Sequence, residues 1–165
     1  MNFEPGARPP GIVGMTNTPL PPDPARALDF WLGHWTVSWG DGLTATNHVD
    51  AILGGAVIRE QFDGRPGAAF QGLSVSAYSP TLGLWRQTWV DSDGSYWAFS
   101  GGPAEGGRFI FATDDVRDGR PVKLSMVFYN LAPDSLDWDW ERSDDDGATW
   151  ALKWRLHYTR QPDPA

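Results

Sequence analysis

The segment Leu136-Asp-Trp-Asp-Trp-Glu-Arg142 decides the fold class, because large and acidic side chains alternate along it. Successive side chains of a β-strand point to opposite faces of the sheet. We therefore expect the three acidic residues of the segment to face water. The residues at even positions, from Leu136 to Arg142, are expected to share the inner face. A period of two over seven residues predicts a strand with one buried face.

The same alternation continues in the last segment of the chain and recurs before it. In 149–160, Trp150, Leu152, Trp154, Leu156 and Tyr158 are predicted to point inward. Gly, Asp, Pro and Asn separate the segments, as is typical of turns. The predicted strands are 35–39, 43–51, 56–62, 69–78, 84–90, 96–100, 108–113, 122–130, 136–143 and 149–160.

Only one short helix is expected, near the N-terminus. Asp23 is a good N-cap, Pro24 suits the first helical position, and Gly33 can end the helical turns of residues 25–31. Residues 1–22, rich in Pro and Gly, are interpreted as a flexible leader, 23–160 as a single barrel domain and 161–165 as a tail. The predicted fold is all-β: an antiparallel barrel of about ten strands with one short N-terminal helix.

Composition excludes several classes of function. The 165 residues carry a formal net charge of −8 without a basic cluster, which argues against nucleic acid as a partner. The chain has no cysteine, and none of its apolar runs is long enough for membrane insertion. No secretory leader is visible, so the cytoplasm is the expected location. The predominance of arginine over lysine suggests a GC-rich bacterial source.

The motif Gly33-His-Trp35 resembles the Gly-x-Trp that opens lipocalin and other calycin barrels. In those folds a late arginine lies across the tryptophan and plugs one end, a role that falls here to Arg160, with Arg155 as second choice. Over residues 28–160 the chain resembles a bacterial lipocalin-like family whose domain is of unknown function. The resemblance rests on the segments 29–35, 54–60, 72–78, 85–91, 143–150 and 158–160. It implies a ten-stranded barrel and no particular activity.

Two acidic segments are interpreted as hairpin turns. Residues 143–150 fit the Asp-box pattern Ser-x-Asp-x-Gly-x-Thr-Trp, in which Asp and Ser side chains bind backbone groups of the turn. Residues 91–94 and 144–147 lack the order of ligands of a calcium-binding EF-hand loop. The three histidines, His34, His48 and His157, have no paired spacing, so no metal site is predicted. Haem bound through His48 is retained as an alternative, because the calycin-like nitrobindins bind haem through one histidine.

The ten tryptophans suggest a lined cavity rather than a dry core. The leading hypothesis is a non-enzymatic binder of a small hydrophobic or aromatic molecule. The predicted apolar wall consists of Trp89, Trp97, Phe99, Trp138, Trp140 and Trp154. Glu60, Gln87, Arg142 and Tyr158 are expected to orient the ligand. Glu60 shares a face with apolar neighbours, so a buried carboxylate is expected, with Arg142 or Gln87 as its partner.

Two further alternatives remain at this stage. A barrel enzyme of the isomerase, cyclase or lyase type would use Glu60 or Tyr158 for proton transfer on an apolar substrate. A barrel without a ligand would instead form a homodimer through Val127 and Tyr129, which are apolar on the side opposite the core.

Overall fold

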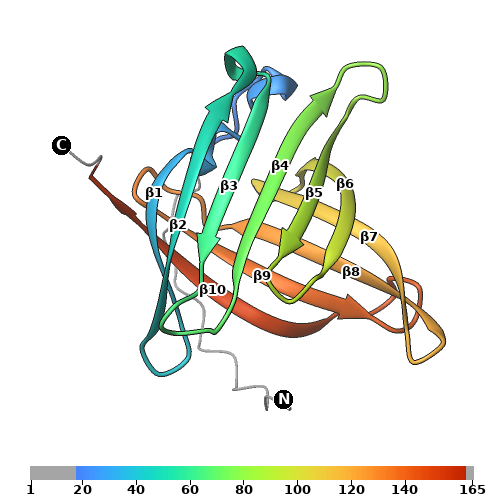
Figure 1. Ribbon diagram of the computed structural model, residues 1–165. Helices are drawn as coiled ribbons and strands as arrows, with labels where there is room; N and C mark the ends of the chain where they lie inside the picture. The colour runs from blue at the N-terminus through green and yellow to red at the C-terminus, as the bar shows by residue number, and fades with distance from the viewer. Residues whose placement is uncertain (1–17, 163–165) are drawn as a thin grey trace.

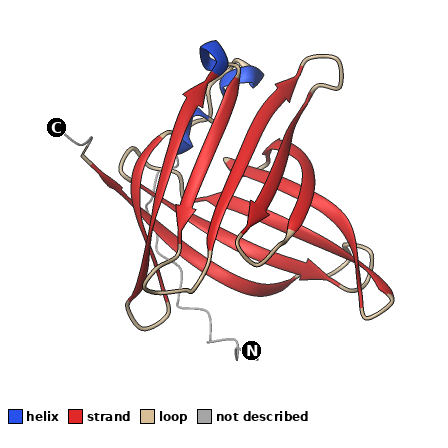
Figure 2. Ribbon diagram, viewed as in Figure 1, coloured by secondary structure: helices blue, strands red, loops and turns tan. Residues whose placement is uncertain are grey.

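The computed structural model describes residues 18–162 and is a closed antiparallel barrel of ten strands (Figures 1 and 2). Each strand pairs with the next along the chain, and β1 pairs with β10 to close the barrel. The predicted fold class is therefore confirmed. The strands are β1 (Gly33–Trp39), β2 (Leu43–Ile52), β3 (Val57–Asp63), β4 (Gln71–Ser79), β5 (Leu84–Asp91), β6 (Tyr96–Ala104), β7 (Arg108–Arg117), β8 (Arg120–Tyr129), β9 (Ser135–Ser143) and β10 (Ala151–Gln161).

The predicted N-terminal helix forms as two 3₁₀ turns, η1 (Pro24–Arg26) and η2 (Asp29–Trp31), which cover one end of the barrel. The Asp23 carboxylate accepts a hydrogen bond from the Ala25 amide, as an N-cap does. Trp85 Nε1 donates to the Pro24 carbonyl at 2.9 Å and thereby fastens η1 to β5. A third turn, η3 (Leu53–Gly55), was not predicted. None of the helical segments among the described residues is long and apolar enough to span a membrane.

The folded domain begins earlier than predicted. Thr18 N donates to the Leu131 carbonyl at 2.7 Å, and Leu20 packs against the core. The last part of the predicted leader is thus attached to the barrel. At the other end, β10 includes Gln161, the first residue of the predicted tail. Residues 1–17 and 163–165, the rest of the predicted leader and tail, lie outside the described part of the chain.

The predicted plug of Trp35 and Arg160 is present at the end covered by η2. The Arg160 guanidinium lies 4.1 Å from the Trp35 ring centroid, and Trp35 Nε1 donates to the Trp31 carbonyl at 2.8 Å. Arg160 also donates to the carbonyls of Phe30, Leu32 and Pro133. Gly33 has a φ of +128°, and a Cβ there would lie 2.3 Å from Arg160 Nη1. Glycine is required at position 33 because Arg160 occupies the space in which any other residue would place its side chain.

The alternation predicted for the last strand fails near its start. The register of β10 shifts between Leu152 and Trp154, and the side chain of Leu152 is 41% exposed. A bulge of this kind turns the residues before it away from the face that the rest of the strand presents. Trp150 is 39% exposed in the preceding turn, while Trp154, Leu156 and Tyr158 point inward as predicted.

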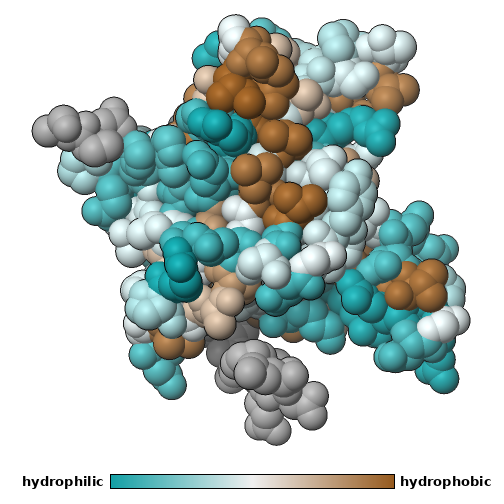
Figure 3. Space-filling view, in the orientation of Figure 1, coloured by the Kyte–Doolittle hydropathy of each residue, from teal (hydrophilic) through white to brown (hydrophobic). Residues whose placement is uncertain are grey.

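The expected dimer patch is not an exposed apolar surface. Val127 is only 8% exposed, and the Tyr129 hydroxyl donates to Asp139 at 3.2 Å. Asp139, expected to face water, is 5% exposed because Arg155 binds its carboxylate with two hydrogen bonds. On the opposite wall, Figure 3 shows an interrupted apolar band on the face formed by β2–β4. Leu73 and Val75 of β4 are exposed apolar residues.

The Asp-box segment forms a turn, as predicted. The Asp145 carboxylate accepts hydrogen bonds from the Thr149 amide and hydroxyl and from the Ser143 hydroxyl. These donors, the Thr149 hydroxyl first, lower the pKa of Asp145 to about 2. The Asp91 carboxylate similarly accepts from the Asp93 and Ser95 amides in the β5–β6 turn. In both segments an aspartate side chain therefore accepts hydrogen bonds from backbone amides of its own turn.

Candidate functional site

A cavity of about 280 Å³ lies inside the barrel. The turn residues Asp93 and Ser95 belong to its lining, so it opens to solvent at the β5–β6 turn. Trp85, bound to η1, lies at the other end of β5, so the mouth faces away from the plugged end. The lining residues are Trp31, Glu60, Phe62, Phe70, Trp89, Asp91, Asp93, Ser95, Trp97, Phe99, Met126, Phe128, Trp138, Trp140, Trp154, Leu156 and Tyr158.

The aromatic wall consists of contacting rings from several strands. Trp138 and Trp140 of β9 stack with an interplanar angle of 6° and centroids 6.3 Å apart. The Trp140 ring then meets Trp97 of β6, and the Trp138 ring meets Trp154 of β10 edge to face. All six residues predicted for the apolar wall line the cavity. Mutual ring contacts of this kind stabilise the aromatic side chains beyond their burial.

A glycine makes room for one of these rings. Gly72 of β4 lies directly beneath Trp89 of β5, and a Cβ at that position would be 2.1 Å from two atoms of the indole. The indole Nε1 donates to the Asp91 carboxylate at 3.0 Å, which fixes its orientation at the mouth. The flat position of Trp89 against the wall therefore requires glycine at residue 72.

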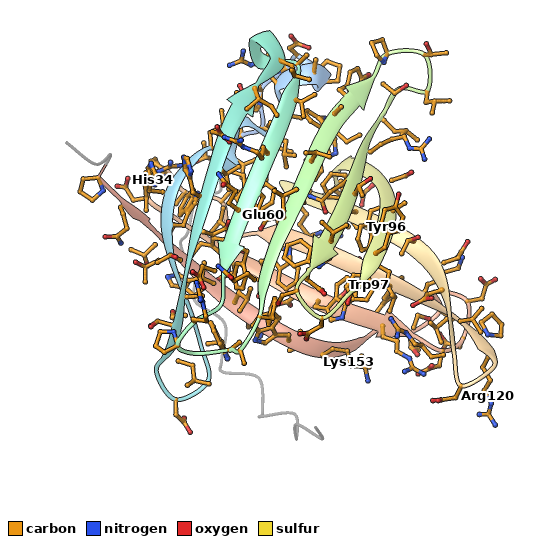
Figure 4. All side chains as sticks on the ribbon, in the orientation of Figure 1. His34, Glu60, Tyr96, Trp97, Arg120 and Lys153 are labelled. Atoms are coloured by element: carbon orange, nitrogen blue, oxygen red, sulfur yellow. The ribbon has the colours of Figure 1, made fainter. Side chains whose placement is uncertain are left out.

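Glu60 is the buried carboxylate of the cavity. It projects inward from β3, and the whole residue is 5% exposed (Figure 4). Asn47 Nδ2 donates to Oε1 and Ser74 Oγ donates to Oε2, both at 2.7 Å. Burial raises the pKa of Glu60 to about 7, although both hydrogen bonds act in the opposite direction. The prediction that Arg142 or Gln87 pairs with Glu60 is wrong. The partners of Glu60 are Asn47 of β2 and Ser74 of β4, two neutral residues on the strands that flank β3.

Tyr158 lies close to this carboxylate. Its hydroxyl is 3.4 Å from Asn47 Nδ2, which donates to it as well as to Glu60. Burial, and then the charge of Glu60, raise the pKa of Tyr158 well above its ordinary value. The hydroxyl is therefore protonated at neutral pH and is available as a hydrogen-bond donor in the cavity.

Two of the predicted ligand-orienting residues lie elsewhere. Arg142 binds the Asp144 carboxylate through Nε and Nη2 and does not line the cavity. Arg142 stands one residue before the end of β9, so its long side chain reaches Asp144 in the following turn instead of the interior. Gln87 is buried, but it donates to the Ser76 hydroxyl at 3.0 Å and lies outside the lining. Of the four predicted orienting residues, Glu60 and Tyr158 belong to the cavity.

His48 is on the outer surface of β2, which does not support the haem hypothesis. Asn47 and Val49, its neighbours in sequence, are the buried ones, so the His48 side chain points away from the cavity. Its ring stacks on His34 of β1 with centroids 4.0 Å apart. Figure 4 shows His34 at the far side of the barrel from Trp97. Within residues 18–162, no cluster of three or more candidate ligands suits a metal ion.

Sequence reasoning missed two residues that hold Glu60. Asn47 occupies an inward position of β2 between Ala45 and Val49, and Ser74 faces inward from β4. The sequence signalled only Asn47, a polar residue whose period-two neighbours Ala45 and Val49 are apolar. Ser74 alternates with Leu73 and Val75, so alternation favours the two apolar residues as the inward ones, whereas they are 41% and 38% exposed and Ser74 is buried. Phe62, Phe70 and Trp31 also line the cavity and were likewise not among the predicted site residues.

A second depression of about 370 Å³ lies on the outside of the barrel between the β1–β2 turn and β10. Its charged groups are already paired, since Arg155 binds Asp139 and His157 Nδ1 lies 2.7 Å from Asp137. The depression is therefore less suited to a ligand than the interior. No protein-family model matches the chain, and a comparison with curated proteins also found no match.

Proposed function

We propose that the protein binds a small apolar or aromatic molecule inside the barrel. The observation that carries the proposal is the open cavity of about 280 Å³, walled by six tryptophans and supplied with hydrogen-bonding groups by Glu60 and Tyr158. A concave, mostly apolar space with a few polar groups is the usual character of a small-molecule site. Membership of the lipocalin-like family belongs to the same proposal and is supported by the closed barrel and its plug. A bacterial source, inferred from the predominance of arginine over lysine, and a cytoplasmic location are further parts of the proposal that rest on the sequence alone.

The volume favours a compact ligand. Sites for drug-sized ligands begin at roughly 300 Å³, and an apolar cavity of about 150 Å³ accommodates benzene. The cavity of about 280 Å³ thus suits a molecule of one or two rings. Trp31, on the lining, is 2% exposed and its Nε1 lacks a hydrogen-bond partner. This nitrogen is itself closed to solvent, so the Trp31 ring contributes to the wall through its apolar surface.

Binding is expected to quench tryptophan fluorescence in a saturable way, because six of the ten indoles surround the ligand. A panel of one- and two-ring aromatic compounds, titrated into the protein, tests this. Trp140→Ala is expected to weaken binding by about fivefold, since an aromatic contact contributes about 1 kcal/mol beyond burial. Trp150→Ala, outside the cavity, is the matched control and should leave the affinity unchanged. Absence of saturable quenching with every compound contradicts the proposal.

A second candidate function is proton transfer by Glu60. Its pKa of about 7 lies near the pH at which a general base is most effective, and it faces an apolar cavity. The alternative is thus an enzyme in which Glu60 acts on a bound apolar substrate and Tyr158 donates a hydrogen bond.

The compound 5-nitrobenzisoxazole tests this candidate. Removal of its carbon-bound proton by a base breaks the ring N–O bond and releases a coloured cyanophenolate. We expect a saturable rate that rises with pH around 7 and falls about a hundredfold in Glu60→Gln. Glu105→Gln changes an exposed glutamate in the β6–β7 turn and should keep the full rate. A rate that Glu60→Gln leaves intact would remove the carboxylate from any proton-transfer role.

A further inference from the structure

The ionisable groups that line the cavity are all acids. Glu60 lies inside, Asp91 and Asp93 lie at the mouth, and Tyr158 has a neutral hydroxyl; Lys, Arg and His are absent from the lining. The Arg117 guanidinium lies 5.8 Å from the Trp97 ring centroid, and Asp115 neutralises it at 2.8 Å. An entering molecule therefore meets negative charge at the mouth and again at depth.

Like the acidic groups of the lining, the aromatic wall favours a positively charged ligand. The face of an indole ring is the negative end of its quadrupole and attracts a cation, and tryptophan is the strongest of the aromatic residues in this respect. Six tryptophans line the cavity, with Trp97, Trp138, Trp140 and Trp154 in mutual contact around it.

Glu60 lacks the counter-charge that a buried carboxylate requires. Its hydrogen-bond partners, Asn47 and Ser74, are neutral, and each oxygen accepts one bond although a carboxylate offers about four acceptor sites. Burying a charge without an opposite charge is costly. A positively charged ligand would supply the missing partner in a place that the protein leaves open.

We propose that the ligand is an organic cation: a compact ammonium compound whose charged nitrogen pairs with Glu60 and whose apolar body lies against the tryptophan rings. This inference rests on the proposed binding function and specifies its ligand class. The cavity thereby combines an aromatic cage with one carboxylate, the chemistry that recognises substituted ammonium groups in proteins.

The matched probes are (4-hydroxyphenyl)trimethylammonium and 4-tert-butylphenol, which differ only in the replacement of the charged nitrogen by carbon. Calorimetric titration of the wild-type protein at pH 8 is expected to show at least about tenfold tighter binding of the cation. Glu60→Gln is expected to remove most of this preference and to leave the affinity for the phenol within about twofold. Glu105→Gln should retain the preference.

The pH dependence in the wild-type protein is a second measurement that needs no variant. The side chains that the structure brings to Glu60 are Asn47 from β2, Ser74 from β4 and Tyr158 from β10, of which only Tyr158 titrates. Since the pKa of Glu60 is about 7, its carboxylate is mostly protonated at pH 6 and mostly ionised at pH 8. The cation is expected to bind about tenfold more tightly at pH 8 than at pH 6, and the phenol equally at both.

The outcomes separate the two proposals. Equal or tighter binding of the phenol by the wild-type protein at pH 8, or cation affinity independent of pH, overturns the cationic ligand and leaves the apolar binding site standing. Failure of both probes to bind overturns the cationic ligand, and it overturns the binding function as well when the panel of aromatic compounds also gives no saturable quenching. If Glu60→Gln proves unfolded by circular dichroism, the wild-type comparison and its pH dependence still decide the question.

Discussion

Trp35→Ala is expected to lower the free energy of unfolding by about 3–5 kcal/mol, the cost of replacing a buried tryptophan by alanine. Trp35 is 2% exposed, donates to the Trp31 carbonyl and packs edge to face with Tyr158. Its loss also removes the ring beneath Arg160, which binds three backbone carbonyls around the closed end. Equilibrium denaturation in urea, followed by far-ultraviolet circular dichroism, measures the change.

Trp150→Ala is the matched control, because this tryptophan is 39% exposed in the turn before β10. Its loss is expected to cost less than about 1 kcal/mol, as is usual for surface positions. Arg160→Ala should fall between the two, because it removes the cation and leaves the indole. Equal destabilisation by the two tryptophan substitutions would show that the plug does not hold the barrel closed.

Glu60→Gln is expected to make the ligand-free protein more stable at pH 8 and to flatten its stability between pH 4.5 and 7. The folded protein holds the pKa of Glu60 at about 7, against 4.5 for an unperturbed glutamate, because burial penalises the charge. The folded state therefore retains its proton where the unfolded state has lost it. The contribution of the group to stability is complete below pH 4.5 and is lost as the pH rises through about 7.

The difference between the two pKa values of Glu60 corresponds to about 3 kcal/mol at pH 8. Measuring the free energy of unfolding from pH 4 to 8 for the wild-type protein and Glu60→Gln isolates this contribution as the difference between the two curves. Asp63 and Asp145, whose pKa values are lowered to about 2, affect both proteins alike and act at more acidic pH. Glu105→Gln should follow the wild-type curve. Parallel curves for wild type and Glu60→Gln would contradict the raised pKa of Glu60.

The free-energy cost of ionising the buried Glu60 couples the stability of the empty barrel to the binding of a ligand. A ligand that brings a positive charge to Glu60 removes the penalty of ionising it, so part of the energy stored in the empty cavity becomes binding energy. A neutral ligand does not remove the penalty of ionising Glu60 and therefore gains no binding energy from it. The same residue thus destabilises the empty barrel at neutral pH and selects what enters it.

Much of the interior could be predicted from the sequence. Period-two alternation placed Trp138 and Trp140 of β9, and Trp154 and Tyr158 of β10, on the inner face, where the structure has them. It failed where the pleat is interrupted, as at the bulge before Trp154 that exposes Leu152. Alternation also predicted that Arg142 points inward. Its position in β9 carried no information about the ion pair that its long side chain makes with Asp144 in the adjoining turn.

The resemblance to lipocalin-like barrels implied the plug of Trp35 and Arg160, which the structure contains. The class of fold, the number of strands and much of the apolar cavity wall could be predicted from the sequence alone. These follow from local alternation and from motifs a few residues long, which depend little on distant parts of the chain. The partners of Glu60 and the open space beside it became known from the three-dimensional structure. Asn47 and Ser74 lie 13 and 14 residues from Glu60 in sequence, and Tyr158 lies 111 residues from Asn47. Their contacts depend on strand register and barrel closure, and the volume that remains depends on how the rings pack against one another.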